Sequence, residues 1–256
     1  MKVLIVKLSS LGDVVHTLPV VHDIKAHFPD AEIDWVVERA FAPLVQRCPG
    51  VDRVIECQFR LWRKSLFSAS NRQAFKSFQQ QLQAQSYDAV IDLQGLGKSA
   101  LVAWLARLSP EGKRFAMANQ TEGSGYEAAT RWVADVAIQM PVHIHALQRG
   151  RLLCAKALGY EMGIAPADSG TFGLKGHTNH EKSKQSPCVA LVQGSSRADK
   201  LWPHEYWLAL AQQLSGAGYC IGLPHGSDTE LSTCQRLASD LARLDVEATV
   251  WTRLAL

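Results

Sequence analysis

The chain has 256 residues, of which 47% are hydrophobic and 20% charged, and its formal net charge is +3 at pH 7. This length allows one large domain or two modest ones, and so small a positive charge does not by itself indicate nucleic-acid binding. The six cysteines form no Cys-x-x-Cys pair, which argues against a disulfide framework or a zinc site and fits a reducing cytosol.

Strand-like and helix-like segments alternate through the first half of the chain. Strands are predicted at 2–8, 33–37, 54–55 and 89–93, and helices at 14–28, 75–82 and 97–108. Such alternation predicts a parallel sheet with right-handed crossovers on both faces. The stretch 109–127 is mixed and polar, and 131–158 is mostly helical in pattern with an interruption at Pro141.

The alternation of strand-like and helix-like segments begins again near residue 188. We expect an N-terminal domain at 1–167, a linker at 168–187 and a partial C-terminal domain at 188–256. Within the last, strands are predicted at 188–192, 219–223 and 246–250, with helices at 203–214 and 229–242. Three strands and two helices make half of a doubly wound domain, so we expect a truncated chain or an incomplete copy.

Nothing in the sequence predicts export or a membrane span. The apolar run 3–6 is interrupted by Lys7 and is too short for a signal peptide, and Arg107 closes the apolar stretch 100–108. We expect a cytosolic protein, for which peripheral attachment to a membrane stays open.

Open parallel sheets bind ligands at loops that follow their strands, and three loops meet this condition: 9–13, 94–99 and 194–200. In the third, Gly194 allows close backbone approach while Ser195 and Ser196 offer hydroxyl donors. Lys200 adds a mobile cation, so the loop suits a diphosphate, and the helix after it adds a favourable dipole. A solvated loop in which Asp199 pairs with Lys200 or Arg197 is an equal alternative.

Three cations, Arg60, Arg63 and Lys64, are interleaved with aromatic residues over 59–64. This pattern can hold a phosphorylated or carboxylated partner, or rest at lipid headgroups. Single-stranded nucleic acid could use the same pattern, but the modest net charge and the lack of a second such stripe argue against it. A solvated basic face is the commoner meaning of such a run.

Two roles compete at Asp13. Aspartate is a preferred N-cap, and the residues after it are predicted to begin a helix. A general base would instead point into a cleft and stay ionised, which a helix N-terminus promotes. Asp92 and Gln94 end a strand and are further candidates, although a structural hydrogen bond is the alternative for Asp92.

Five motifs, in order over nearly the whole chain, carry a family resemblance: Lys7-Leu-Ser-Ser-Leu-Gly-Asp-Val-Val-His-Thr-Leu-Pro19, Trp62-Arg-Lys64, Tyr87-Asp-Ala-Val-Ile-Asp-Leu-Gln-Gly-Leu-Gly-Lys-Ser99, Lys156-Ala-Leu-Gly-Tyr160 and Asp199-Lys-Leu-Trp-Pro203. On these motifs the sequence resembles the lipopolysaccharide heptosyltransferases of glycosyltransferase family 9. The resemblance implies a GT-B fold, in which two Rossmann-like, doubly wound α/β domains face each other across a cleft, the second incomplete here. It also implies inverting transfer of L-glycero-D-manno-heptose from ADP-heptose to Kdo of Kdo2-lipid A, on the cytoplasmic face of the inner membrane, with no metal, cofactor or nucleic acid.

The resemblance further implies roles for individual residues. Asp13 would be the general base that takes the proton of the acceptor hydroxyl. The donor side would use Ser195, Ser196 and Lys200 for the diphosphate and Glu230 for the ribose. The acceptor side would use Arg60, Arg63, Lys64, Lys98 and His145.

Two departures from the family pattern affect these expectations. The family's later Asp-Thr-Gly-x-Ser-His loop does not occur in the chain, so we expect impaired donor binding, and 115–126 lacks a basic residue expected on the acceptor side. The enzymes that add heptose to heptose are an alternative, which 62–64 disfavours. A non-catalytic nucleotide- or phospholipid-binding protein, in which Asp13 only caps a helix, is another. A nicotinamide enzyme is disfavoured because no Gly-x-Gly-x-x-Gly follows any strand.

Overall fold

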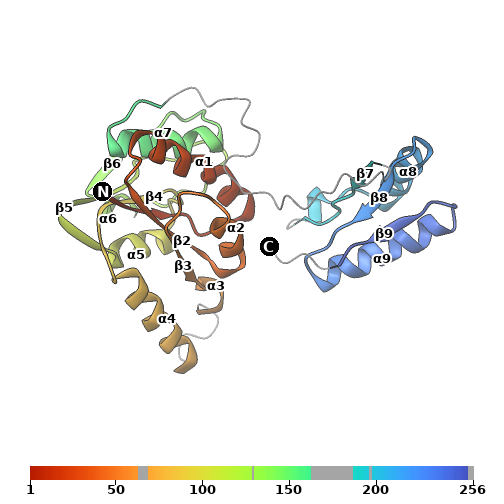
Figure 1. Ribbon diagram of the computed structural model, residues 1–256, viewed down its shortest axis with the longest axis horizontal. Helices are drawn as coiled ribbons and strands as arrows, with labels where there is room; N and C mark the ends of the chain where they lie inside the picture. The colour runs from red at the N-terminus through yellow and green to blue at the C-terminus, as the bar shows by residue number, and fades with distance from the viewer. Residues whose placement is uncertain (63–68, 129, 163–186, 196–197, 253–256) are drawn as a thin grey trace. The chain divides into compact units, whose positions relative to one another are not determined.

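The computed structural model describes residues 1–62, 69–128, 130–162, 187–195 and 198–252. The chain divides into two compact units, Met1–Gly176 and His177–Leu256 (Figure 1). The linker predicted at 168–187 lies, apart from Pro187, outside the described residues. Within the described ranges, no helix combines the length and the apolar composition that a membrane crossing requires.

The first unit is built on a six-stranded sheet in which every strand pairs in parallel with its neighbours, in the order β3-β2-β1-β4-β5-β6. The strands are β1 (Lys2–Val6), β2 (Glu32–Glu38), β3 (Arg53–Cys57), β4 (Ser86–Asp92), β5 (Arg107–Met117) and β6 (Val136–Ile138). The helices are α1 (Leu11–His27), α2 (Ala42–Gln46), α3 (Phe59–Trp62), α4 (Ala69–Leu82), α5 (Gly97–Leu105), α6 (Thr130–Val133) and α7 (Ala146–Leu158), with a short 3-10 helix η1 (Arg39–Phe41).

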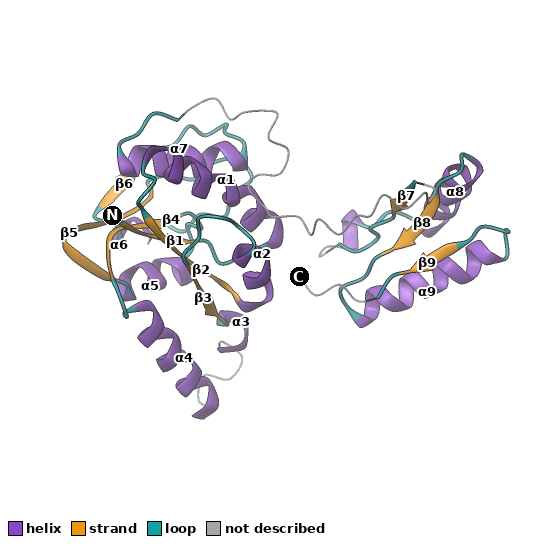
Figure 2. Cartoon of the chain, viewed as in Figure 1, coloured by secondary structure: helices purple, strands orange, loops and turns teal. Residues whose placement is uncertain are grey.

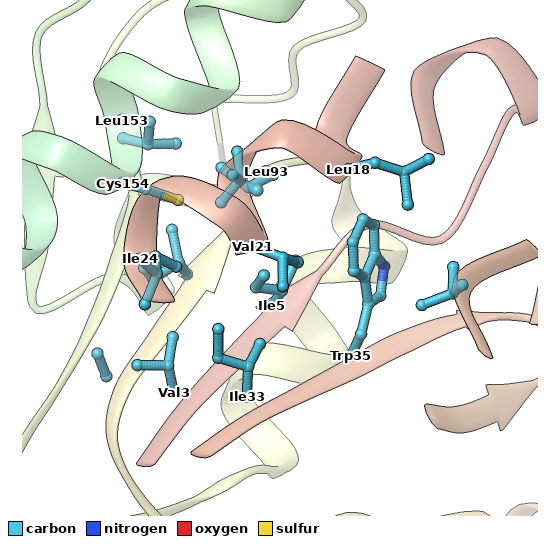
Figure 3. Packing of buried hydrophobic residues seen from close by; sticks show 14 of the residues in the cluster. Val3, Ile5, Leu18, Val21, Ile24, Ile33, Trp35, Leu93, Leu153 and Cys154 are labelled. Atoms are coloured by element: carbon cyan, nitrogen blue, oxygen red, sulfur yellow. The ribbon is translucent and has the colours of Figure 1, made fainter. Parts of the chain in front are cut away.

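Alternate residues of the central strand β1 face two separate cores, because successive side chains of a strand point to opposite faces. Val3 and Ile5 pack against α1, α2 and α7, as Figure 3 shows for Leu18, Val21 and Leu153. Their neighbours on β1, Leu4 and Val6, pack against α3, α4 and α5. These three helices lie on the other face of the sheet from α1 and α7 (Figure 2). The strands are hydrophobic on both sides, as parallel sheets covered on both faces require.

The aromatic residues of 59–64 belong to this second core. Trp62 is 6% exposed, and its ring lies 5.1, 5.3 and 5.4 Å from the rings of Phe59, Phe75 and Phe78. Phe59 is partly buried against the same cluster. These rings therefore support the fold and do not form a surface stripe with the neighbouring cations.

The second unit contains a three-stranded parallel sheet in the order β7-β8-β9 among the described residues. Its strands are β7 (Cys188–Ala190), β8 (Cys220–Leu223) and β9 (Ala248–Val250), and its helices are α8 (His204–Gly216) and α9 (Asp228–Ala242), with a short 3-10 helix η2 (Ala198–Lys200). Ile221, Leu237 and Leu241 are at most 2% exposed and hold this sheet against its helices.

Helix α1 and the strands β5 and β6 differ from the sequence prediction. Helix α1 begins at Leu11, one turn before the predicted start at residue 14, because Ser10 serves as its N-cap. Strands β5 and β6 lie where the sequence suggested polar and helical segments. Pro110, Gly112 and several charges hide the strand pattern of β5, whose pairing with β4 is also irregular between Tyr87 and Ala89.

Candidate active site

A recess opens at the carboxyl end of β1, beside the loop that leads into α1. It is lined by Lys7, Asp13, His16, Thr17, Leu93, Met117, Ala146, Arg149, Gly150 and Leu153. Its volume is about 10 Å³, which is about the space of one water molecule. The recess itself therefore holds only a small group, and its charged lining consists of Lys7, Asp13 and Arg149.

Asp13 occupies the third position of α1. The backbone N–H and the hydroxyl of Ser10, the N-cap, donate to Asp13 Oδ2 at 3.0 and 2.8 Å. The other oxygen, Oδ1, lies 3.7 Å from Lys7 Nζ, and the Asp13 side chain is 37% exposed. The interpretation of Asp13 as the N-cap is therefore wrong, although its carboxylate still supports the start of the helix through the bond to the N-cap N–H.

Two of the predicted acceptor residues lie beside this site. Lys98 Nζ donates to Ser9 Oγ at 2.9 Å, so its ammonium group is held against the loop that leads to Asp13. His145 is the N-cap of α7, and its ring lies 5.7 Å from the ring of His16, which lines the recess. The structure thus brings Lys98 and His145 to the same end of the sheet as Asp13.

The remaining predicted acceptor residues cannot be placed in the same way. Arg63 and Lys64 lie outside the described residues. Arg60 belongs to α3, and its side chain is likewise outside the described part of the chain.

A carboxylate also occupies the N-terminus of α5, the helix that follows β4. Glu127 Oε2 accepts the N–H of Gly97 at 2.8 Å. Asp92 is 2% exposed and accepts bonds from the N–H groups of Gln94 and Gly95 and from Ser99 Oγ. Asp92 is thus a structural residue of this turn, and the helix start carries a carboxylate of the protein itself.

In the second unit, the loops that follow β7 and β8 meet at Glu230. Glu230 Oε2 accepts the N–H groups of Gly226 and Ser227 at 2.7 and 3.0 Å, at the start of α9. A Cβ on Gly194 would overlap Glu230 Oε1 and lie 2.9 Å from its Cδ, so the backbone of Gly194 packs directly on this carboxylate. Ser195 and Lys200 are exposed on the same loop, whereas Ser196 lies outside the described residues.

Comparison with known proteins identifies the family. The family model "Glycosyltransferase family 9 (heptosyltransferase)" matches residues 75–256. The chain belongs to glycosyltransferase family 9. It is 39% identical over 251 residues to lipopolysaccharide heptosyltransferase 1 of Escherichia coli (strain K12), covering 96% of this chain and 75% of that protein. Lipopolysaccharide heptosyltransferase 2 of the same strain is 27% identical over 261 residues, covering 99% of this chain and 70% of that protein.

Solved structures of family 9 enzymes share the fold. The E. coli heptosyltransferase WaaC with ADP matches this chain with a TM-score of 0.85 and 36% identity, covering 100% of this chain and 76% of that chain. WaaC with ADP-2-deoxy-2-fluoro heptose matches with a TM-score of 0.84, 36% identity and coverage of 100% and 78%. These matches confirm the predicted family and the predicted GT-B type of α/β fold.

The electrostatics of this family 9 site keep Asp13 charged. Partial burial by itself raises the pKa of Asp13, but the Lys7 ammonium, the two bonds from Ser10 and the Arg149 guanidinium together lower it below its ordinary value. Asp13 is therefore an ionised carboxylate at neutral pH, able to accept a hydrogen bond from an alcohol.

The two cations beside Asp13 are buried, with Lys7 5% and Arg149 6% exposed. Lys7 Nζ donates to the carbonyl of Leu93 at 3.0 Å, and Arg149 Nη1 donates to Thr121 Oγ1 at 3.0 Å. Burial lowers the pKa of both groups, and Asp13 partly offsets this. The Asp13 charge thus favours the charged forms of Lys7 and Arg149, and their charges favour the ionised form of Asp13.

Sequence reasoning did not select Lys7 or Arg149 as site residues. Two signals could have found them. Lys7 follows a buried strand directly and so stands at the edge where the sheet binds ligands. Arg149 lies four residues after His145, one helical turn along the same face of α7.

Among the described residues, no three His, Cys, Asp or Glu side chains are placed to hold one metal ion together. The cations that line the recess are Lys7 and Arg149, and the carboxylate that lines it is Asp13.

Proposed function

We propose that the protein is an inverting glycosyltransferase that moves L-glycero-D-manno-heptose from ADP-heptose to Kdo of Kdo2-lipid A, in the synthesis of the lipopolysaccharide inner core. The observation that carries this proposal is the geometry of Asp13. Its carboxylate is ionised, partly exposed and fixed in orientation at the carboxyl end of a parallel sheet. The chain is 39% identical to E. coli lipopolysaccharide heptosyltransferase 1 but only 27% identical to heptosyltransferase 2. This difference supports a Kdo acceptor over a heptose acceptor.

In the proposed reaction Asp13 is the general base. The acceptor hydroxyl oxygen forms a bond to the anomeric carbon of the heptose while its proton passes to Asp13. The bond between the anomeric carbon and the phosphate oxygen breaks, and its electron pair leaves with ADP. One displacement from the face opposite the leaving group inverts the anomeric centre. Ser10 supports this role, because its two bonds hold Oδ2 and so orient the carboxylate.

The donor diphosphate belongs to the second unit in this proposal. The helices that follow β1 and β4 each have a protein carboxylate at the first turn, Asp13 and Glu127. These carboxylates would repel a phosphate, and they already accept the backbone N–H groups of Ser10 and Gly97. The loop with Ser195, Ser196 and Lys200 offers hydroxyls and a cation instead. Glu230 would contact the ribose, with Oε2 held by backbone groups. That WaaC was solved with ADP and with an ADP-heptose analogue supports the same donor here.

The acceptor would lie on the first unit, over the Asp13 site. Lys98 and His145, which flank Asp13, would contact its acidic groups, together with Arg60, Arg63 and Lys64. Cations next to carboxylates and phosphates give strong, charge-assisted hydrogen bonds. They would also hold a hydroxyl of the Kdo residue within reach of Asp13.

We also propose that the protein meets this lipid acceptor as a peripheral protein on the cytoplasmic face of the inner membrane. Trp104 on α5 and Trp132 on α6 are 63% and 80% exposed, and the two helices contact each other. Exposed tryptophans favour the headgroup region of a bilayer, because one end of the ring is apolar and the other polar.

The experiment that tests the function is a transfer assay with ADP-heptose and three acceptors: Kdo2-lipid A, the same lipid already carrying one heptose, and lipid A without Kdo. Mass spectrometry of the lipid measures the added heptose, and NMR of the product gives its anomeric configuration. We expect transfer to Kdo2-lipid A alone, with inversion. Transfer only to the heptose-bearing lipid would favour the heptose-adding alternative, and ADP binding without any transfer would favour a non-catalytic nucleotide-binding protein.

A matched variant tests the donor side. Lys200→Ala should weaken the binding of ADP without changing the unfolding temperature, because Lys200 is exposed and lies outside the hydrophobic core. Isothermal titration with ADP measures the affinity. An affinity equal to that of the unsubstituted protein would remove Lys200 from the diphosphate site.

A further inference from the structure

Two cysteines face each other across the first two strands of the second unit. Strand β7 begins at Cys188 and β8 begins at Cys220, and the parallel ladder pairs these two residues directly. The Cys220 N–H also donates to the carbonyl of Pro187 at 3.0 Å, which fixes the two strand starts to each other. Because paired strands lie about 4.8 Å apart, the two Cα atoms fall within the separation of about 4.4–6.8 Å that disulfides span.

The two thiols lie on the same side of this sheet. Side chains alternate along a strand, and the next residues, Val189 and Ile221, point into the hydrophobic core formed with α8 and α9. Cys188 and Cys220 therefore both project from the opposite face. The Cys220 thiol forms a hydrogen bond with Cys188 and raises the pKa of Cys188.

No other cysteine of the chain has both a partner and access to solvent. Cys188 is exposed and Cys220 is half-buried, whereas Cys48, Cys57, Cys154 and Cys234 are buried. Burial raises the pKa of the Cys48 thiol to about 11, and it raises those of Cys57, Cys154 and Cys234 as well. What separates these four thiols from Cys188 and Cys220 is their burial, because structural cysteines buried in this way are inert toward reagents in solution.

We propose that Cys188 and Cys220 are a reversible thiol–disulfide pair, oxidised by a small disulfide of the glutathione type. One thiolate attacks oxidised glutathione, forms a mixed disulfide and releases one glutathione. The second cysteine then attacks the protein-bound sulfur and releases the other glutathione. The two protein thiols lose two protons and two electrons in total, and one oxidised glutathione becomes two reduced ones.

The disulfide would join β7 to β8, the middle strand of the sheet in the described part of this unit. It would close the chain segment between residues 188 and 220, which contains α8, and such cross-links stabilise a fold by restricting its unfolded chain. The pair lies at the amino ends of both strands, whereas Ser195 and Glu230 follow their carboxyl ends. Oxidation should therefore stabilise the second unit without occupying the proposed donor loops.

The test is peptide mapping of the protein after incubation with oxidised glutathione. Free thiols are alkylated, the protein is digested without reductant, and mass spectrometry identifies cross-linked peptides. We expect the peptides that contain Cys188 and Cys220 to be linked, with the loss of two hydrogen atoms, and we expect the unfolding temperature to rise and to fall back with dithiothreitol. A lasting glutathione adduct on Cys188, or unmodified thiols in a protein left for hours with excess reagent, would overturn the proposal.

Matched variants separate this pair from the other cysteines. Cys188→Ser and Cys220→Ser should each abolish both the cross-link and the temperature rise, whereas Cys48→Ala should keep both, because Cys48 is buried in the other unit. The mapping needs no transfer activity, so its outcome does not depend on the proposed function. A temperature rise that persists in Cys188→Ser would contradict the assignment of the pair.

Discussion

Replacing Asp13 by asparagine separates its two possible roles, because asparagine keeps an oxygen that accepts the Ser10 N–H but loses the charge. Two unit charges 3.7 Å apart, as Lys7 Nζ and Asp13 Oδ1 are, attract by about 1 kcal/mol in water and about 4 kcal/mol at an effective dielectric constant of 20. Since the Asp13 side chain is 37% exposed, solvent screening places the pair toward the lower value.

The loss of the charge from the N-terminus of helix α1 adds a second contribution to the fall in unfolding free energy. A negative charge in the first turn stabilises a helix by about 0.3–1 kcal/mol. Together, the lost ion pair and the lost helix term predict that Asp13→Asn lowers the free energy of unfolding by about 1–3 kcal/mol, which urea titration can measure. Removal of a general base predicts that kcat falls by roughly 10²–10⁴-fold.

The control for this prediction is Ser10→Ala. It removes the hydroxyl bond to Asp13 Oδ2 and should lower the free energy of unfolding by about 1 kcal/mol, the usual net value of one hydrogen bond, but it keeps the carboxylate. We expect its kcat to fall by less than about tenfold. If Asp13→Asn retains a kcat within tenfold of the unsubstituted protein while losing the stability expected, Asp13 is a helix-capping residue and the base lies elsewhere.

Three further predictions address the surroundings of this site and the donor loop. Gly194→Ala should weaken ADP binding in calorimetry, because its Cβ would overlap a Glu230 carboxylate that two backbone groups hold in place; unchanged affinity would separate this loop from the donor. The lowered pKa of Asp13 means that its contribution to stability is present above the ordinary value of 3.8 and is lost only as the pH falls through that lower pKa. In Lys7→Met the acid limb of kcat/KM should therefore move to higher pH, and a limb that stays in place would show that Lys7 does not set this pKa. Trp62→Ala should lower the free energy of unfolding by about 3–5 kcal/mol in urea titration, whereas a ligand-contacting surface residue would leave it nearly unchanged.

Most of the fold followed from hydrophobic periodicity. The strands β1, β2 and β4 contain the apolar runs 3–6, 35–37 and 89–91, and such runs are a strong signal of a buried parallel sheet. Strand β5 was not predicted, because Pro110, Gly112 and its charges break the pattern, and long-range pairing with β4 and β6 makes it a strand. Trp62 was assigned to a surface pattern because the sequence alone does not show that Phe75 and Phe78 fold back onto it.

The site was predicted only in part, for a related reason. The sequence placed Asp13 in the predicted loop 9–13 after a strand, at the sheet edge where parallel sheets bind ligands, so its position near a site could be derived. The buried cations Lys7 and Arg149 come from elements more than 140 residues apart, and only the packing of α7 against α1 brings them together. Burial of a charge near a carboxylate is a tertiary property, and a linear pattern of residues does not encode it.

The low pKa of Asp13 has a consequence for the timing of proton transfer. A base that removes the acceptor proton before the sugar is attacked would need a raised pKa, close to the working pH. The cations and the Ser10 bonds work in the opposite direction. In an oxocarbenium-like transition state, by contrast, the bond to ADP is largely broken before the acceptor bond forms, and the hydroxyl becomes acidic only as it bonds to the anomeric carbon. A weak, permanently ionised carboxylate suffices for that sequence, so the surroundings of Asp13 favour late proton transfer.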